Sequence, residues 1–288
     1  VNVPAGTALG YEITGIAASR VSGGLTGTVT IDAFGRAIID LSVVANSLTD
    51  GATTAVVRLT NGQASTSVVV NDTSTTPAVG QSFTLTTAPD NFVGGSANDT
   101  FNGTFSDGGT NTLNSGDILT GNAGTDSLII TSNILAAATT LTDGLWNNVS
   151  GIDNISVTTG AGTIGMVTGS AFQTAFASSG VNLTATTTGG AITIDMTTFT
   201  GTETIVTSSG AGAETITTGS GVANVTATST AGALTIKGVG LAFVSATTTG
   251  AGAQTIGDLI GGGANLVTVN ATANAGAQII HSTSTSAV

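Results

Sequence analysis

The feature that most constrains this fold is a short phrase that recurs about every 20 residues. The phrase reads GAGAETI at 210–216 and GAGAQTI at 250–256, with the variants GGAITI, AGALTI and NAGAQII. A fixed period of this length in a β-rich sequence indicates a solenoid, because one repeat does not bury its own face and stacks on the next. Aligned on one alanine, the phrases have equivalent positions at Ala191, Ala213, Ala233, Ala253 and Ala277.

Each period contains a second alternating stretch, about eight residues before the alanine. Examples are VNLTATTT at 181–188 and NVTATST at 224–230. Two short strands per period predict a parallel β-helix with about 20–24 residues per coil, right-handed by the general crossover rule. Alternation along the strand places Ile216 on the opposite face from Thr215, and we expect isoleucine inside and threonine outside. We expect the glycines between strands to supply positive φ angles at the corners.

The composition supports an all-β chain and excludes several classes of function. Only 7% of the residues are charged, 42 of 288 are glycine, and β-branched residues dominate, so we expect almost no α-helix. Thr, Ser and Gly interrupt every apolar stretch, which argues against insertion into a membrane. The net charge is −12, and four cations are too few to neutralise a row of phosphates, which argues against nucleic-acid binding. The absence of cysteine excludes a disulfide scaffold.

Larger side chains lie in the less regular stretches of the second half. Trp146, Phe172 and Phe176 interrupt the repeat, and we interpret them as core residues that fill a wider cross-section or cap an insertion. The sequence VNVPAGTALG at the start lacks the pattern of a signal peptide. We therefore expect a C-terminal secretion signal, or a chain that is one piece of a longer polypeptide.

Residues 1–77 have a different pattern from the rest. Separate alternating stretches such as YEITGI, LTGTVTI, RAIIDLSVV and TAVVRLT predict an antiparallel, immunoglobulin-like β-sandwich over 1–77, whose missing edge strand comes from residues absent here or from a neighbouring subunit. The stretches DAFGRA and TNGQA predict hairpin turns. Residues 78–87 are then a linker, 88–127 an acidic segment, and 128–288 the β-helix, which we expect to begin near residue 125.

The acidic segment carries the one pattern with chemistry attached to it. GGSANDTFN at 94–102 and GNAGTDSLI at 121–129 approximate the nonapeptide G-G-x-G-x-D-x-U-x, in which glycine turns and an aspartate bind calcium between coils. Asp99 and Asp117 are two nonapeptides apart, which predicts that they lie on the same side of adjacent coils. An alternative is that the carboxylates cap backbone N–H groups without any metal. The candidate Ca²⁺ ligands are Asp90, Asp99, Asp107, Asp117 and Asp126.

In order along the chain, these segments resemble bacterial RTX-type surface-layer proteins over about residues 83–288. The segments are FTLTTAPDNFVGGSANDTF, LNSGDILTGNAGTDSLII, VSGIDNISVTTGAG and the Thr/Ala/Gly repeats. The first module resembles the Calx-β and immunoglobulin-like repeats of large secreted bacterial adhesins, with VNDTS matching the acidic end of a repeat. The resemblance implies type I secretion, an extracellular place on the bacterial cell surface, calcium-dependent ordering, and self-assembly of copies into a lattice or fibre.

Three classes of function compete on the sequence alone. We expect a structural surface protein, which needs repeats and acidity but no catalytic residues. An adhesin or stalk that binds cell-surface polysaccharide is the alternative, although aromatic residues for a sugar platform are scarce. A β-helix enzyme needs carboxylates with Lys, Arg or His on one face of several coils, and we expect no enzyme. The residues available for one are scattered: Asp195, Glu203, Glu214, Lys237, Asp258 and His281.

Overall fold

The computed structural model describes residues 3–44, 51–62, 64–73, 78–106, 110–134, 138–257 and 268–281. The chain divides into two compact units, residues 1–77 and 78–288. The prediction of an all-β chain is confirmed, and the second unit contains a parallel β-solenoid of about seven turns. No helix in the described ranges is long and apolar enough to cross a membrane.

The first unit contains a four-stranded antiparallel sheet. The strands are β1 (Ala8–Thr14), β3 (Thr26–Thr30), β5 (Thr53–Leu59) and β6 (Ser65–Val70), in the order β3-β1-β5-β6. A second pair consists of β2 (Val21–Ser22), which follows the 3-10 turn η1 (Ala18–Arg20), and β4 (Ser42–Val43). Ile13, Ile16, Val21 and Ala55 form a small core. The complete immunoglobulin-like sandwich stays a prediction.

The two turn predictions in this unit have different outcomes. The strands on either side of TNGQA, β5 and β6, pair antiparallel as a hairpin requires, and Gly62 has a positive φ of 75°, while Gln63 lies outside the described residues. DAFGRA is a tight turn in which Asp32 accepts the N–H groups of Phe34 and Arg36. The strand expected over RAIIDLSVV shortens to β4, and Ile38 is 80% exposed, since no strand within the described ranges pairs with it.

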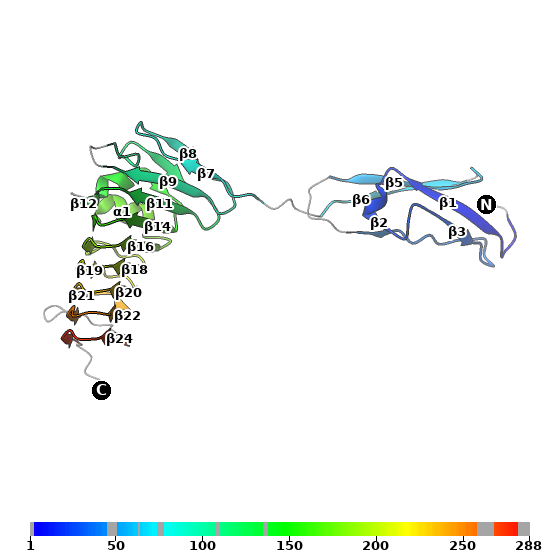
Figure 1. Ribbon diagram of the computed structural model, residues 1–288. Helices are drawn as coiled ribbons and strands as arrows, with labels where there is room; N and C mark the ends of the chain where they lie inside the picture. Colours follow the sequence, from blue (N-terminus) through cyan, green and yellow to red (C-terminus); the bar gives the residue numbers. More distant parts are fainter. Residues whose placement is uncertain are drawn as a thin grey trace. The chain divides into compact units, whose positions relative to one another are not determined.

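Three parallel sheets form the solenoid, whose coils stack as rungs in Figure 1. The nine-stranded sheet contains β7 (Ser82–Thr84), β9 (Thr100–Phe105), β11 (Ser127–Ser132), β14 (Asn154–Thr159), β16 (Val181–Thr187), β18 (Glu203–Ser209), β20 (Ala223–Ser229), β22 (Leu241–Thr248) and β24 (Thr268–Ala273). The seven-stranded sheet contains β12 (Ala138–Leu141), β15 (Thr163–Val167), β17 (Ile192–Asp195), β19 (Glu214–Thr218), β21 (Leu234–Gly238), β23 (Gln254–Ile256) and β25 (Gln278–Ile280). The third sheet contains β8 (Asn91–Val93), β10 (Ile118–Thr120) and β13 (Val149–Ser150).

The solenoid begins earlier than the sequence pattern suggested. Strand β7 already belongs to the nine-stranded sheet, so residues expected to form a linker and a separate calcium segment form the first coils instead. The short period expected from the sequence applies only to the later coils, where Ile192 pairs with Glu214 and Glu214 with Leu234. The early coils are longer, because Ser127 pairs with Asn154. Their handedness stays a prediction.

The wider coils hold an aromatic cluster, as predicted. A short helix, α1 (Ser170–Phe176), and a 3-10 turn, η2 (Asp143–Trp146), place Trp146, Phe172 and Phe176 in the core with exposures of 1% or less. The ring centroids of Trp146 and Phe172 are 5.4 Å apart in an edge-to-face arrangement. Asp143 fixes the start of α1, because its carboxylate accepts the N–H groups of Gly169, Ala171 and Phe172.

In the later, shorter coils, which we call the narrow coils, isoleucine points inward and threonine outward, as expected. Ile216, Ile236 and Ile256 are completely buried, whereas Thr215 and Thr235 lie on the outer side. The core cluster therefore runs through the stacked coils as one continuous hydrophobic column.

The expectation of positive φ at the corners is correct for Gly151, Gly180 and Gly257, but the glycines of the repeated phrase serve close approach instead. A Cβ on Gly212 would lie 1.8 Å from the carbonyl oxygen of Gly190, and one on Gly232 would lie 1.9 Å from that of Gly212. Gly252 and Gly276 continue this glycine ladder. None of these four has a positive φ. Any side chain here would push adjacent coils apart.

A buried row of hydroxyl side chains satisfies the backbone of the same corner. Ser209 Oγ donates to the carbonyl oxygen of Gly212 at 2.8 Å, and Ser229 Oγ accepts the N–H of Gly232 at 2.8 Å. Ser132, Thr159, Thr187, Ser209, Ser229 and Thr248, each at most 4% exposed, form this hydroxyl ladder. It provides the hydrogen bonds that a buried corner in an all-β fold otherwise lacks.

We predict that Gly232→Ala lowers the thermal midpoint of the solenoid, because its Cβ collides with backbone that has no alternative position. The expected cost is about 1–3 kcal/mol, as for other overpacked sites. Circular dichroism during heating measures it. Gly189→Ala is the matched control, since its nearest neighbour is 3.8 Å away and its φ is not positive. Equal midpoints for the two variants would contradict the glycine-ladder argument.

Candidate functional site

The predicted calcium residues fall into two stacked columns at the start of the solenoid. Asp99, Asp126 and Asp153 each directly precede a strand of the nine-stranded sheet, and the strand register aligns them on successive coils. Asp90 and Asp117 form a second column before β8 and β10. Asp107 lies outside the described residues. We call the first column the aspartate ladder; its third member, Asp153, was not among the predicted ligands.

The predicted pairing of Asp99 with Asp117 is wrong. The coil at this point has the length of three nonapeptides and not two, so Asp99 aligns with Asp126 and Asp90 with Asp117. The nine-residue spacing of the aspartates is correct, but the sequence does not show how many nine-residue units one coil contains. The three-sheet cross-section requires the longer coil.

In the aspartate ladder, each carboxylate binds the backbone of the preceding coil. Asp126 Oδ1 accepts the N–H of Asp99 at 2.7 Å, and Asp153 Oδ2 accepts the N–H of Asp126 at 2.8 Å. Asp99 accepts the N–H groups of Gln81 and Gly95, both at 2.6 Å. This is the capping geometry that the sequence left open as the alternative to metal binding.

The second column has the same chemistry. Asp117 Oδ1 accepts the N–H of Asp90 at 3.0 Å, and its Oδ2 accepts the N–H of Asn114 at 2.8 Å. Asp90 in turn accepts the N–H and the hydroxyl of Thr86. Both oxygens of Asp99 and both of Asp117 therefore already have N–H donors.

Two glycines of the nonapeptide-like stretches make room for these carboxylates. A Cβ on Gly94 would lie 2.2 Å from Asp99 Oδ2, and one on Gly121 would lie 2.5 Å from Asp126 Oδ2. Gly94 and Gly121 are separated by one full coil, as are Asp99 and Asp126. The glycine-plus-aspartate spacing that suggested calcium thus has a direct steric role.

One carboxylate oxygen of the aspartate ladder is buried without a hydrogen-bond partner among the described residues. Asp126 is 0% exposed, and its Oδ2 is buried without a hydrogen bond. Burial raises the pKa of Asp126; the N–H of Asp99 opposes this shift, and the neighbouring charges of Asp99 and Asp153 add to it. Oδ2 is therefore the position in this ladder where a proton or a cation is most favourable. Among the described residues, no group of three or more His, Cys, Asp or Glu side chains forms a metal cluster.

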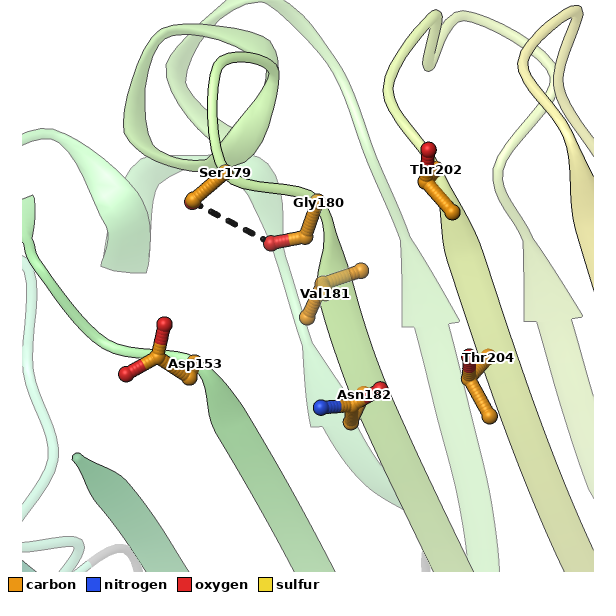
Figure 2. Close-up of a pocket in the computed structure, with 7 residues that line it drawn as sticks. All are labelled: Asp153, Ser179, Gly180, Val181, Asn182, Thr202 and Thr204. Carbon is orange, nitrogen blue, oxygen red and sulfur yellow. Dashed lines mark hydrogen bonds between the residues drawn. The ribbon is translucent and has the colours of Figure 1, made fainter. Parts of the chain in front are cut away.

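A small polar pocket lies beside the end of the aspartate ladder (Figure 2). Its volume is about 90 Å³, and Asp153 lies on one side of β16 with Thr202 and Thr204 on the other. Asn182 lies between them, and its amide Nδ2 donates to Asn154 Oδ1 at 3.0 Å. The pocket offers hydroxyl, amide and carboxylate groups to a polar ligand.

Two further acids, expected from the sequence to be scattered, are both buried in the later, shorter coils. Glu203 and Glu214 are both 0% exposed. Glu203 Oε1 accepts the N–H of Gly219 at 2.9 Å, while Glu214 Oε2 accepts the Thr207 hydroxyl. The remaining oxygen of each has no hydrogen-bond partner. The signal was present in the sequence, since Glu214 alternates in phase with the inward Ile216.

Burial determines the protonation of these two acids. Desolvation raises the pKa of Glu203 to about 8, and the single N–H of Gly219 opposes the shift only partly. Desolvation also raises the pKa of Glu214, against the hydrogen bond from the Thr207 hydroxyl. Glu203 is consequently mostly protonated at neutral pH and adds no full charge to the core.

Comparison of the chain with protein-family models, with curated proteins and with solved structures found no match.

We predict that the stability of the solenoid falls as the pH rises from about 4.5 to about 8 because of Glu203. Its unfolded pKa is near 4.5 and its folded pKa is about 8, so the folded state binds the extra proton in this window. The stabilisation is complete below the unfolded pKa, and about 5 kcal/mol of it is lost once the pH exceeds the folded pKa.

Thermal midpoints measured across this pH range test the prediction. Glu203→Gln should flatten the pH profile and melt at a higher temperature than the native chain at pH 9. Asp195→Asn removes one negative charge from the outer side and is the control. A Glu203→Gln profile parallel to that of the native chain would show that this carboxyl does not titrate in the core.

Proposed function

We propose that the chain is a structural protein that assembles with copies of itself, outside the cell on a bacterial surface, and that calcium orders it. The observation that carries this proposal is the outer face of the nine-stranded sheet. From β9 to β24 the outward side chains include no Lys, Arg, Asp or Glu. A flat and uncharged face of this length can approach another such face without desolvating charges.

The regularity of this face supports the same proposal. Its outermost row is hydroxylated on every coil: Thr104, Thr131, Thr158, Thr186, Ser208, Thr228, Thr247 and Thr272. Hydrogen bonds between coils fix another row of the same face, in which Asn154 Nδ2 donates to Ser127 Oγ at 3.3 Å. Coils ~4.8 Å apart thus repeat the same polar pattern along the solenoid.

The alternative is an adhesin or stalk that binds surface glycans. The polar pocket at Asp153 and Asn182 favours it, because these groups pair with sugar hydroxyls. We propose no catalytic role, since the buried acids Glu203 and Glu214 face the core, where a substrate does not reach them.

Electron microscopy of the purified chain tests the assembly proposal. In millimolar calcium we expect sheets or filaments, and we expect them to dissolve in excess chelator. Monodisperse particles under both conditions would contradict the proposal. Binding to a glycan array that Asp153→Ala abolishes would then support the adhesin.

We predict that calcium raises the thermal midpoint of the native chain and that Asp126→Asn removes this shift. The variant keeps an oxygen that accepts the N–H of Asp99, but it replaces the carboxylate oxygen Oδ2, which is buried without a partner, by an uncharged amide group. Asp143→Asn, at the start of α1, is the matched control and should retain the calcium response. If capping is the whole role of the ladder, calcium leaves all three midpoints unchanged.

A further inference from the structure

Strand β6 is an edge strand that lacks the usual protection of an edge. Among the residues that the structure describes, β6 pairs only with β5, so the other side of the strand carries the backbone groups available for pairing. Its sequence, STSVVV, contains no charge and no proline. Val68 is 46% exposed and Val69 is 60% exposed.

The inner face of the sheet is also open at this edge. The register places Val68 opposite the fully buried Ala55, and Thr66 opposite Val57, so Val68 and Thr66 face the core side. An apolar cavity of about 160 Å³ lies next to the edge, lined by Ile39, Val57, Leu59, Ala64, Ser65 and Thr66. A partner that adds a strand to β6 also covers this cavity.

We propose that β6 pairs antiparallel with β6 of a second copy of this chain. A two-fold axis at Val68 sets Val68 against its equivalent, Ser67 against Val69, and Thr66 against Val70. In this register opposed residues share a face, so the inner faces of the two sheets lie on one side of a continuous eight-stranded sheet. The inference deepens the proposed self-assembly, on which it rests, by naming a contact surface.

The distribution of charge favours a second copy as the occupant. Residues 1–77 contain five acidic and three basic residues, a net charge of −2, whereas residues 78–288 contain eleven acidic and one basic residue, a net charge of −10. Two copies therefore repel each other least through the first unit. An antiparallel edge is also self-complementary in its backbone donors and acceptors.

Cysteine cross-linking of the full chain tests the pairing, because the chain has no cysteine of its own. Directly opposed residues of an antiparallel pair have Cα atoms about 4.5–5.5 Å apart, within the disulfide range of about 4.4–6.8 Å. Under mild oxidation, Val68→Cys should form disulfide dimers about tenfold faster than Thr28→Cys, since pairing raises the effective concentration. Thr28 is exposed on β3, at the opposite edge of the sheet.

Sedimentation velocity over a range of concentrations gives a second measurement without oxidation. The native chain should dimerise, and Val68→Lys should remain monomeric because two charges then face each other at the axis. Circular dichroism confirms that each variant is folded. Equal cross-linking of the two cysteine variants would overturn the proposal. A native monomer in which the β6 amides that do not bond to β5 are protected from hydrogen exchange would also overturn it, because another segment then covers the edge.

The outcomes distinguish this inference from the proposed function. Ordered assemblies in the electron microscope without cross-linking at Val68→Cys would retain self-assembly and reject β6 as its contact. Cross-linked dimers without larger assemblies would retain the β6 contact and reject the lattice or fibre.

Discussion

The contact between each corner glycine and the carbonyl of the glycine one coil earlier determines how the rest of the solenoid packs. With a Cβ position only 1.8 Å from the Gly190 oxygen, Gly212 has no space for any side chain. The two sheets that meet at this corner therefore approach closely, and the interior between them is narrow. Alanine, valine and isoleucine fill such an interior, which explains the scarcity of aromatic residues after Phe199.

A tight corner buries backbone N–H and C=O groups away from water, and the hydroxyl ladder provides hydrogen bonds for them. Thr187 Oγ1 donates to Gly162 O at 2.9 Å, and Thr248 Oγ1 donates to Gly252 O at 3.2 Å. Serine and threonine are short enough to reach nearby backbone without leaving a strand conformation. Threonine is therefore abundant for two reasons. In the outer rows it provides a polar side chain that faces solvent, and in the inner row its hydroxyl bonds to the backbone of the corner.

The solenoid could be predicted from the sequence because residues with the same structural role recur once per coil. Ala213, Ala233 and Ala253 mark equivalent positions, and the inward isoleucines follow from alternation. The candidate site was harder to predict, because Asp99 and Asp117 obey a nine-residue grid that is compatible with several coil lengths. Only the three-sheet cross-section determines how many nonapeptides one coil contains, and no local pattern encodes that cross-section.

Some buried acids of this chain accept several backbone N–H groups, whereas others are buried with few hydrogen bonds. The difference follows the width of the coil in which each acid lies. One register row contains Asp99, Asp126 and Asp153 in wide coils, then Val181, then Glu203 in a narrow coil. The aspartates lie at turns, where backbone N–H groups point at their carboxylates. Glu203 begins a strand inside the hydrophobic column, and burial raises its pKa to about 8, so that it is mostly protonated at neutral pH. The solenoid therefore carries less than its formal charge at neutral pH, and the repulsion between copies is correspondingly weaker.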